Sequence, residues 1–328
     1  MAPPPLIRLA RLAMAARFEL VIADIGDASF LQAAGEEALN EISDCERLLS
    51  VHRPDGELFR INAHAAKGPM RADPRVLQFI IQAQSLAELT HGTCDIAIGP
   101  LLDAWRIQRT DTDLLSAPTE DEIASALRLV NVRQQVVVDL NAGTVVFTQP
   151  GVRLDPGALG KGWAIKRAIT LLREHGITRA LLHGGTSSVA AIGAPLEHSA
   201  WHIGIANPQS GSVIATALLS NNSLSVSALH GRQLITGGQL HGHIIDPRTG
   251  HPVSHTALSA VVHADGVIAE AWSTAMLVDQ NVAQQCSVSA WLPKSTALVV
   301  SDKNLELNCD TSGPDFIPFH TKSIVRNI

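Results

Sequence analysis

Cysteine is scarce in this sequence of 328 residues, and its four cysteines form no CxxC pair. They are Cys45, Cys94, Cys286 and Cys309. Because metal clusters and disulfide frameworks use tighter, patterned spacing, four reduced thiols are the better interpretation. Runs of lysine or arginine are also missing, and the formal net charge is −6. A nucleic-acid surface needs clustered positive charge, so we expect no nucleic-acid partner.

Long apolar runs are absent as well. Arg8, Arg11 and Arg17 interrupt every apolar stretch near the N-terminus, which leaves no core for a signal peptide or lipoprotein signal. No other stretch has the apolar length that a membrane span needs. We therefore expect a cytoplasmic protein. Hydrophobic residues make up 46% and charged residues 17%, which predicts a sizeable buried core.

The pattern of elements predicts an α+β fold. Asp73 precedes Pro74, a typical start for a helix over residues 74–89, and residues 119–122 form a capping-box pattern. A helix over 161–174 is expected to stop at Gly176 and to lead into a strand over 177–182. Hairpins and separated helices fit α+β better than regular βαβ alternation. No linker divides the chain, so we expect one compact domain, with a bilobed form as the alternative.

The first motif is the glycine-rich turn at residues 154–163. Gly157, Gly160 and Gly162 lead into the helix predicted from Lys161. Unpaired amides at such a helix start attract anions, and glycine lets a phosphate approach the backbone. The spacing to Lys161 is too short for a Walker A loop. A plain tight turn would explain the glycines, but it would not explain Asp155 together with Lys161.

The second motif is HGGTSS at residues 183–188, where Gly184, Gly185 and the hydroxyls could line a phosphate or a ribose. The alternative is a tight turn whose hydroxyls satisfy loop amides. The third motif is HGHIIDPRTG at residues 241–250, in which His243 could act as a general base near pH 7. Its HxH pair is a weak zinc candidate, because no further Cys or His has suitable spacing.

The fourth motif is AEAWSTA at residues 269–275. On a helix, Glu270, Ser273 and Thr274 lie at i, i+3 and i+4, so their oxygens share one face. One carboxylate beside two hydroxyls suits a hard cation such as Mg²⁺ that also holds substrate phosphates. The alternative is an amphipathic helix with a solvated glutamate, but apolar residues follow at once.

These four segments, in this order, resemble the signature blocks of the ApbE family of FAD:protein FMN transferases. The likeness extends over nearly the whole chain, and the most specific block is HIIDPRTG. Earlier segments also resemble family blocks, namely residues 13–15, 49–54, 60–62, and 92–95 with 99–101 and Trp105. The resemblance implies an ApbE-like (T-fold-like) α+β fold with mixed sheets and flanking helices. It places the transferase domain at residues 12–328, after an N-terminal extension at 1–11.

The resemblance also implies the chemistry. Family members use Mg²⁺ to split FAD, move FMN onto a Thr or Ser of an acceptor protein and release AMP. His243 matches the position proposed to activate the attacking hydroxyl, and Mg²⁺ would take the carbonyl of Ala158 with oxygens from Glu270, Ser273 and Thr274. The residues expected to contact the dinucleotide are Met14, His52, Thr93, Cys94, Asp95, Asp155, Lys161, Gly184 and Gly185.

Three departures from the family pattern bear on function. Glu270 stands where the family usually has aspartate, His52 replaces the usual tyrosine, and residues 183–188 differ from the usual GGDI. Two alternatives therefore stand beside FMN transfer. One is a non-catalytic FAD-binding protein, and the other is an FAD pyrophosphatase that gives FMN and AMP. The acceptor protein and the preferred metal stay open, as does the oligomeric state, with a homodimer as one alternative.

Overall fold

A computed structural model describes most of the chain. The described residues are 6–107, 117–207, 210–229, 233–236, 239–254, 256–282, 296–301, 307–311 and 316–318. Within them, no helix has the length and apolar character needed to cross a bilayer.

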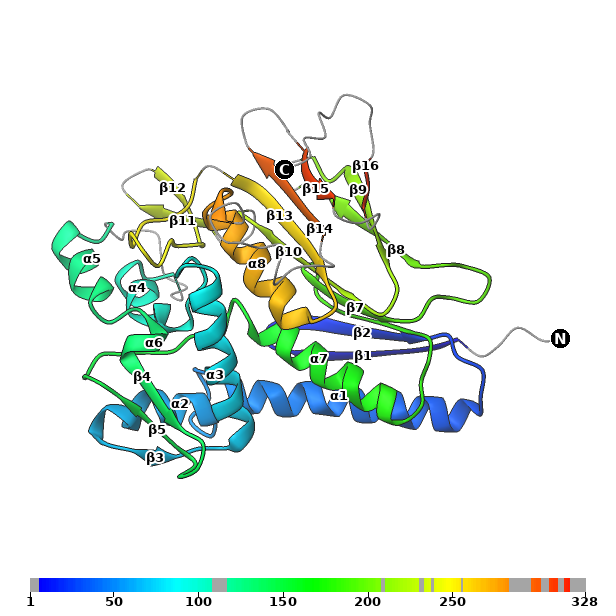
Figure 1. Cartoon of the computed structure of the whole chain (residues 1–328), viewed down its shortest axis with the longest axis horizontal. Coiled ribbons are helices and arrows are strands. Elements are labelled where there is room, and N and C mark those ends of the chain that lie inside the picture. The colour runs from blue at the N-terminus through cyan, green and yellow to red at the C-terminus, as the bar shows by residue number, and fades with distance from the viewer. Residues whose placement is uncertain are drawn as a thin grey trace.

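An antiparallel sheet of eight strands forms the centre of the molecule, in the order β1-β2-β6-β7-β10-β13-β14-β15 (Figure 1). Its strands are β1 (Ile7–Ala13), β2 (Ala16–Ile22), β6 (Ala180–Gly184), β7 (Ser188–Ile192), β10 (Ser223–Ala228), β13 (Thr256–His263), β14 (Thr296–Ser301) and β15 (Leu307–Thr311). β1 begins at Ile7 and pairs along its whole length with β2. The boundary predicted between residues 11 and 12 therefore falls inside a sheet strand.

Three long helices cover one face of this sheet (Figure 1). They are α1 (Ala28–Leu49), α7 (Gly160–Glu174) and α8 (Gly266–Val278), and their apolar faces form the largest buried cluster with the strands beneath them. The opposite face carries a second cluster, where β7, β10 and β13 pack on a small sheet of order β16-β9-β8. Its strands are β8 (Trp201–Ala206), β9 (Val213–Leu219) and β16 (Phe316–Pro318). Burial on both faces explains why every residue of β7 is buried.

The remaining elements lie at one end of the main sheet (Figure 1). The helices there are α2 (Glu57–His64), α3 (Pro74–Leu89), α4 (Gly99–Ala104), α5 (Glu120–Leu127) and α6 (Val132–Gln135), with short 3-10 turns at Ala65–Lys67 and Ile96–Ile98. The strands are β3 (Met70–Arg71), β4 (Val136–Asp139) and β5 (Thr144–Phe147) in one small sheet, and the pair β11 (Gln233–Thr236) and β12 (Gln239–Gly242).

Several local predictions are confirmed. The α3 helix spans the predicted residues, with the Asp73 carboxylate capping it, and α5 carries the complete capping box at Thr119 and Glu122. Gly176 follows α7 with φ of 77°, in the left-handed region that favours glycine. Cys45 and Cys94 are buried free thiols, while the thiols of Cys286 and Cys309 lie outside the described part.

One predicted boundary is wrong: the strand expected from residue 177 begins only at Ala180. The reason is the buried carboxylate of Asp24, just after β2, which accepts hydrogen bonds from the backbone amides of Thr178 and Arg179. Those amides are therefore not available to a neighbouring strand. Asp24 also accepts from the Thr178 hydroxyl and pairs with the Arg179 guanidinium at 3.1 Å.

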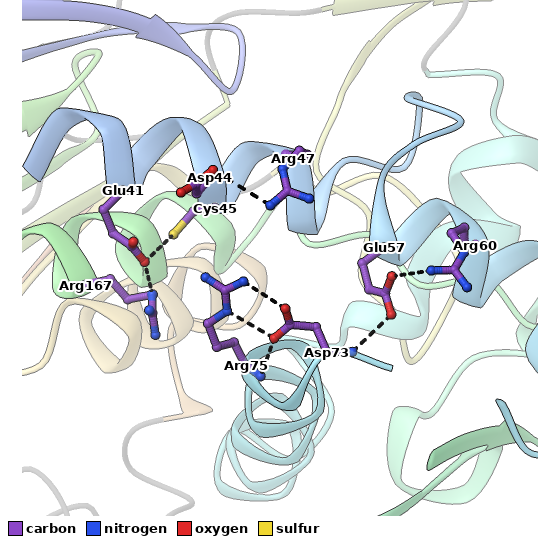
Figure 2. A network of polar contacts seen from close by, with 9 residues as sticks. All are labelled: Glu41, Asp44, Cys45, Arg47, Glu57, Arg60, Asp73, Arg75 and Arg167. Atoms are coloured by element: carbon purple, nitrogen blue, oxygen red, sulfur yellow. Dashed lines mark hydrogen bonds and ion pairs between the residues drawn. The ribbon is translucent and has the colours of Figure 1, made fainter. Parts of the chain in front are cut away.

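A charged network joins the helices on the covered face (Figure 2). Arg167 of α7 donates to Glu41 of α1 and stacks over the Trp163 ring, with 5.3 Å between its guanidinium carbon and the ring centre. The Cys45 thiol also contacts the Glu41 carboxylate, at 3.8 Å. Burial, and then the charge of Glu41, raise the pKa of Cys45 to about 12. The thiol therefore stays protonated, and the network fixes α7 against α1.

The contacts of the Asp24 carboxylate with Thr178 and Arg179, here called the Asp24 clamp, make the stability of the protein depend on pH. Burial alone would raise the pKa of Asp24, but hydrogen bonds from Thr178, Ile25 and Arg179 outweigh burial and lower it. A lowered pKa stabilises the folded state above the unfolded value of about 3.9, and the benefit disappears as the pH falls through the folded pKa. We predict that Asp24→Asn lowers the unfolding free energy at pH 7 by about 1–3 kcal/mol.

Denaturant unfolding of both proteins between pH 7 and pH 3 checks this prediction. The difference between wild type and Asp24→Asn should narrow as the pH falls below about 4. The exposed Asp44, which contacts Arg47 only at 3.8 Å, provides the matched control Asp44→Asn. Equal effects of the two substitutions would contradict the clamp.

Candidate functional site

A cavity of about 960 Å³ lies between the loop after α3, the start of α7, the strands β6, β7, β8 and β10, and helix α8. Most of the residues predicted for the site line it: Thr93, Cys94, Asp95, Asp155, Ala158, Lys161, Gly185, His243, Glu270 and Thr274. They come from segments far apart in the sequence, so the tertiary fold brings the predicted motifs together. Aliphatic side chains of β6, β7, β8, β10 and β13 form much of the remaining wall, together with residues 98–107 and 244–247 in part, and the hydroxyls of residues 186–188, 225 and 227 interrupt it.

The turn before α7 supplies Asp155 and Ala158, and the first turn of α7 supplies Lys161. Its entry is fixed by Asn62 of α2, whose amide donates to the Leu154 carbonyl at 2.9 Å and accepts from the Leu154 amide at 2.8 Å. Asp155 accepts from the Gly157 amide at 2.9 Å, and the Asp155 amide donates to Ile96 at 2.7 Å. The helix begins at Gly160, so Lys161 lies in its first turn, as the sequence predicts.

The start of α7 packs directly on α8, and Gly162 allows this contact. A Cβ at Gly162 would lie 2.7 Å from the Gly266 carbonyl oxygen and 2.9 Å from both Cδ and Oε2 of Glu270. No side chain would fit there without a shift of backbone. The turn that carries Asp155 and Lys161 therefore lies next to the helix that carries Glu270 and Thr274. The magnesium hypothesis requires this juxtaposition.

Glu270 is buried beneath that contact, with 4% of its surface exposed. Its Oε1 accepts a hydrogen bond of 2.5 Å from the Ser188 hydroxyl, at the start of β7. Its Oε2 is buried and has no hydrogen-bond partner among the described residues. Burial raises the pKa of Glu270, while the positive charge of Lys161, the Ser188 hydrogen bond and the Gly162 backbone amide oppose that rise. The Ser188 hydroxyl thus fixes one carboxylate oxygen, while the other is buried against Gly162.

Ser273 and Thr274 face different surroundings, although both follow Glu270 on α8. Thr274, one turn beyond Glu270, lines the cavity. Ser273 is fully buried and lies outside the lining. Its hydroxyl lies 2.9 Å from those of Ser225 and Ser227 on β10. The structure thus places the Ser273 side chain against β10 and not in the cavity wall.

The loop after α3 places Thr93, Cys94 and Asp95 against the cavity. The Thr93 hydroxyl donates to the Thr90 carbonyl at 2.6 Å, and Asp95 accepts from the amides of Ala97 at 2.7 Å and Val132 at 3.0 Å. Burial raises the pKa of Asp95 to about 6, although these two backbone hydrogen bonds oppose it. Burial also raises the pKa of the Cys94 thiol. The Thr93 hydroxyl and the Asp95 carboxylate thus help to fix the shape of the loop.

His243 lines the cavity just after β12 ends at Gly242. The predicted turn follows it and is tightly held. Arg248 pairs with Asp246 at 2.9 Å and with Asp279, just beyond α8, at 3.2 Å. The indole of Trp105 donates to the Gly250 carbonyl at 2.7 Å. This bracing fixes the segment that carries His243 relative to α8.

Three further predicted residues lie outside the cavity lining. Met14 sits at the corner between β1 and β2, with its methyl group 3.2 Å from where a Cβ on Gly160 would be. It is thus close to the start of α7. His52 is exposed in the loop after α1. Gly184 ends β6, where a Cβ would lie 2.6 Å from the Phe18 ring, so its role in the fold is to allow close packing.

Sequence reasoning missed two residues that hold the site in place. Ser188 lies in the HGGTSS motif, but the motif gave no sign that its last serine would contact Glu270. Asn62 lies in a segment that resembles a family block, and nothing local assigned it to the turn at Leu154. Among the described residues, no group of three or more His, Cys, Asp or Glu could hold a metal. A cation here would rely on one carboxylate and neutral oxygens.

The comparisons with known proteins fit this site. The sequence model of the ApbE family matches residues 14–290, so the chain belongs to the ApbE family. An FAD:protein FMN transferase of Klebsiella pneumoniae (strain 342) is 28% identical over 259 residues, which cover 78% of each protein. An FAD:protein FMN transferase of Treponema pallidum (strain Nichols) is 30% identical over 251 residues, covering 71% of this chain and 67% of the relative.

Solved structures support the same fold. The ApbE protein of Thermotoga maritima superposes with a TM-score of 0.81 at 23% identity, covering 91% of this chain and 95% of that structure. The flavin transferase ApbE of Vibrio cholerae gives a TM-score of 0.77 at 21% identity, covering 94% and 97%. The predicted ApbE-like α+β fold is confirmed.

The contact between α7 and α8 predicts that Gly162→Ala destabilises the protein. Alanine in a helix is normally better than glycine by about 1 kcal/mol. Here the added methyl group would overlap the Gly266 carbonyl and Glu270, and overpacking of this kind costs about 1–3 kcal/mol. Denaturant unfolding measures the loss of unfolding free energy.

Gly26→Ala is the control, because the nearest atoms to its Cβ would be those of Leu31, at 3.6 Å or more. A Gly162→Ala protein as stable as this control would refute the close contact.

Proposed function

We propose that this chain transfers FMN from FAD to a Thr or Ser hydroxyl of an acceptor protein and releases AMP, with Mg²⁺ as the metal. Two observations support the proposal together. The chain belongs to the ApbE family, and its curated relatives are FAD:protein FMN transferases. Its cavity also gathers Lys161, Glu270, Thr274 and His243, which arrive from separate motifs. The second observation carries the proposal, because it concerns this chain's own residues.

The start of α7 is the proposed diphosphate site. Amides at a helix N-terminus and the Lys161 ammonium both favour negative charge, and the glycines leave the backbone accessible. The nearby Asp155, together with residues 93–95 and Gly185, would contact the rest of the nucleotide. Met14 lies against the start of α7 and would flank the flavin. In this proposal His52 and Gly184 make no direct contact with FAD inside the cavity, since neither residue lines it.

The residues present fit a hard divalent cation. A buried carboxylate oxygen without a partner is costly, and Glu270 Oε2 is such an atom among the described residues. Thr274 and Ala158 line the same cavity and offer a hydroxyl oxygen and a carbonyl oxygen. These three residues would hold Mg²⁺, which would neutralise negative charge on the diphosphate.

The remaining steps use the protein's own groups. The acceptor hydroxyl attacks the phosphorus on the FMN side, a new P–O bond forms, and the bond to the bridging oxygen breaks, so that AMP leaves. His243 accepts the proton of the hydroxyl, a role suited to a neutral imidazole near pH 7. Lys161 stabilises charge on the phosphoryl oxygens. The aliphatic part of the cavity wall excludes water, which favours transfer over hydrolysis.

We predict that His243→Ala abolishes covalent labelling. The assay incubates purified protein with FAD, Mg²⁺ and a flavin-acceptor domain, and covalent flavin fluorescence is then read on a denaturing gel. General bases contribute about 10²–10⁴-fold to rates. Unchanged labelling by the variant would remove His243 from this role. Product chromatography without an acceptor separates the alternatives, since rapid AMP release favours a pyrophosphatase and bound FAD without AMP favours a binding protein.

We also predict that Glu270→Asp requires more Mg²⁺ than wild type for half-maximal FAD turnover. Aspartate is shorter by one methylene, about 1.5 Å, so its carboxylate would withdraw from Ser188, which now donates at 2.5 Å. Magnesium tolerates little error in its octahedral shell. A Mg²⁺ titration of both proteins measures the shift. A lower requirement in the variant would mean that the glutamate is not adapted to this site.

A further inference from the structure

A chain of hydroxyl groups joins β10 to α8 beside the cavity. Ser225 and Ser273 are buried and Ser227 and Thr274 are half-buried, and all but Ser273 line the cavity. The Ser273 hydroxyl donates to the Glu270 backbone carbonyl at 3.1 Å. The hydroxyls of Ser225 and Ser227 on β10 each lie 2.9 Å from the Ser273 oxygen. Ser227 also lies 3.4 Å from the Thr274 hydroxyl, which reaches the cavity wall.

The four contacts can all form at once in only one direction of hydrogen-bond donation. A hydroxyl has one proton to donate and two lone pairs. The proton of Ser273 goes to the Glu270 carbonyl, which can only accept, so Ser225 and Ser227 must both donate to Ser273. Ser227 has then used its proton, and its contact with Thr274 requires Thr274 to be the donor. Both lone pairs of Thr274 are consequently left for partners in the cavity.

We infer that Ser273 is a positioning residue that sets this direction and keeps Thr274 an acceptor toward a divalent cation in the cavity. The inference rests on the proposed function, because it takes the cation site from there. A hydroxyl coordinates a cation through its lone pairs, so the reverse direction would aim a proton at the cation. Ser273 thereby acts on the site although it lies outside the cavity lining.

Removal of each hydroxyl is expected to change the direction of hydrogen-bond donation to a different extent. Without Ser273, Ser227 regains its proton and can donate it to Thr274, which reverses the direction. Without Ser227, Thr274 loses the acceptor for its proton. Without Ser225, Ser227 still donates to Ser273 and Thr274 still donates to Ser227. Ser259 lies on the neighbouring strand β13, is fully buried and has no hydrogen-bond partner among the described residues, so its removal changes nothing in the chain.

The experiment measures binding of Mn²⁺ alone to the full-length protein, from the electron paramagnetic resonance signal of free Mn²⁺. It compares wild type with Ser273→Ala, Ser227→Ala, Ser225→Ala and Ser259→Ala. We expect the Kd for Mn²⁺ to rise about ten-fold in Ser273→Ala and Ser227→Ala, the size typical for residues that orient metal ligands. We expect Ser225→Ala and Ser259→Ala to bind as wild type does.

Thermal unfolding of each variant accompanies the titration. If Ser273→Ala does not fold, Ser227→Ala decides the outcome, because Ser227 is only half-buried. Unchanged binding in both variants would overturn the inference, as would equal losses in Ser225→Ala and Ser273→Ala or a wild type that binds no Mn²⁺. The proposed FMN transfer is tested separately by the labelling assay. If the labelling assay shows no FMN transfer while the variants give the expected Mn²⁺ affinities, the proposed activity is rejected and the positioning role of Ser273 stands.

Discussion

The close contact between α7 and α8 is the constraint on which the site depends. Gly162 lies against the Gly266 carbonyl and the Glu270 carboxylate, with no room for a side chain. This contact brings a positively polarised helix start and Lys161 to a buried carboxylate. Burying that carboxylate is unfavourable, as its raised pKa indicates, and Lys161 and Ser188 compensate for part of the cost. The contact therefore leaves Glu270 Oε2 buried where a cation is proposed to bind.

The rest of the fold holds this contact in place from both sides. Arg167 fixes α7 to α1 on the outer side (Figure 2). The hydroxyls of β7 and β10 hold α8 from the sheet. Asn62 holds the turn before α7, while the ion pair between Arg248 and Asp279 ties the His243 segment to the far end of α8. Each motif is thus braced by a residue from a different part of the chain.

The sequence predicted the local elements well, because their determinants are local. Asp73 with Pro74 defined α3, and the Thr119 capping box defined α5. The strand after α7 was misplaced because the competing carboxylate of Asp24 lies more than 150 residues away in the sequence. The same limit applies to the site. Helical spacing put Ser273 and Thr274 near Glu270, but spacing alone could not show that Ser273 turns toward the hydroxyls of β10.

The order of strands in the main sheet has a consequence for how the site is assembled. β2 pairs with β6, more than 150 residues later, and α8 packs on the paired strands β10 and β13. Such non-local pairing slows folding, because distant segments must meet before their contacts stabilise them. Lys161 and Glu270 lie more than 100 residues apart, so a nascent chain lacks the buried carboxylate of the cavity until synthesis passes α8. A ligand that requires both residues can therefore bind only after α8 has been made.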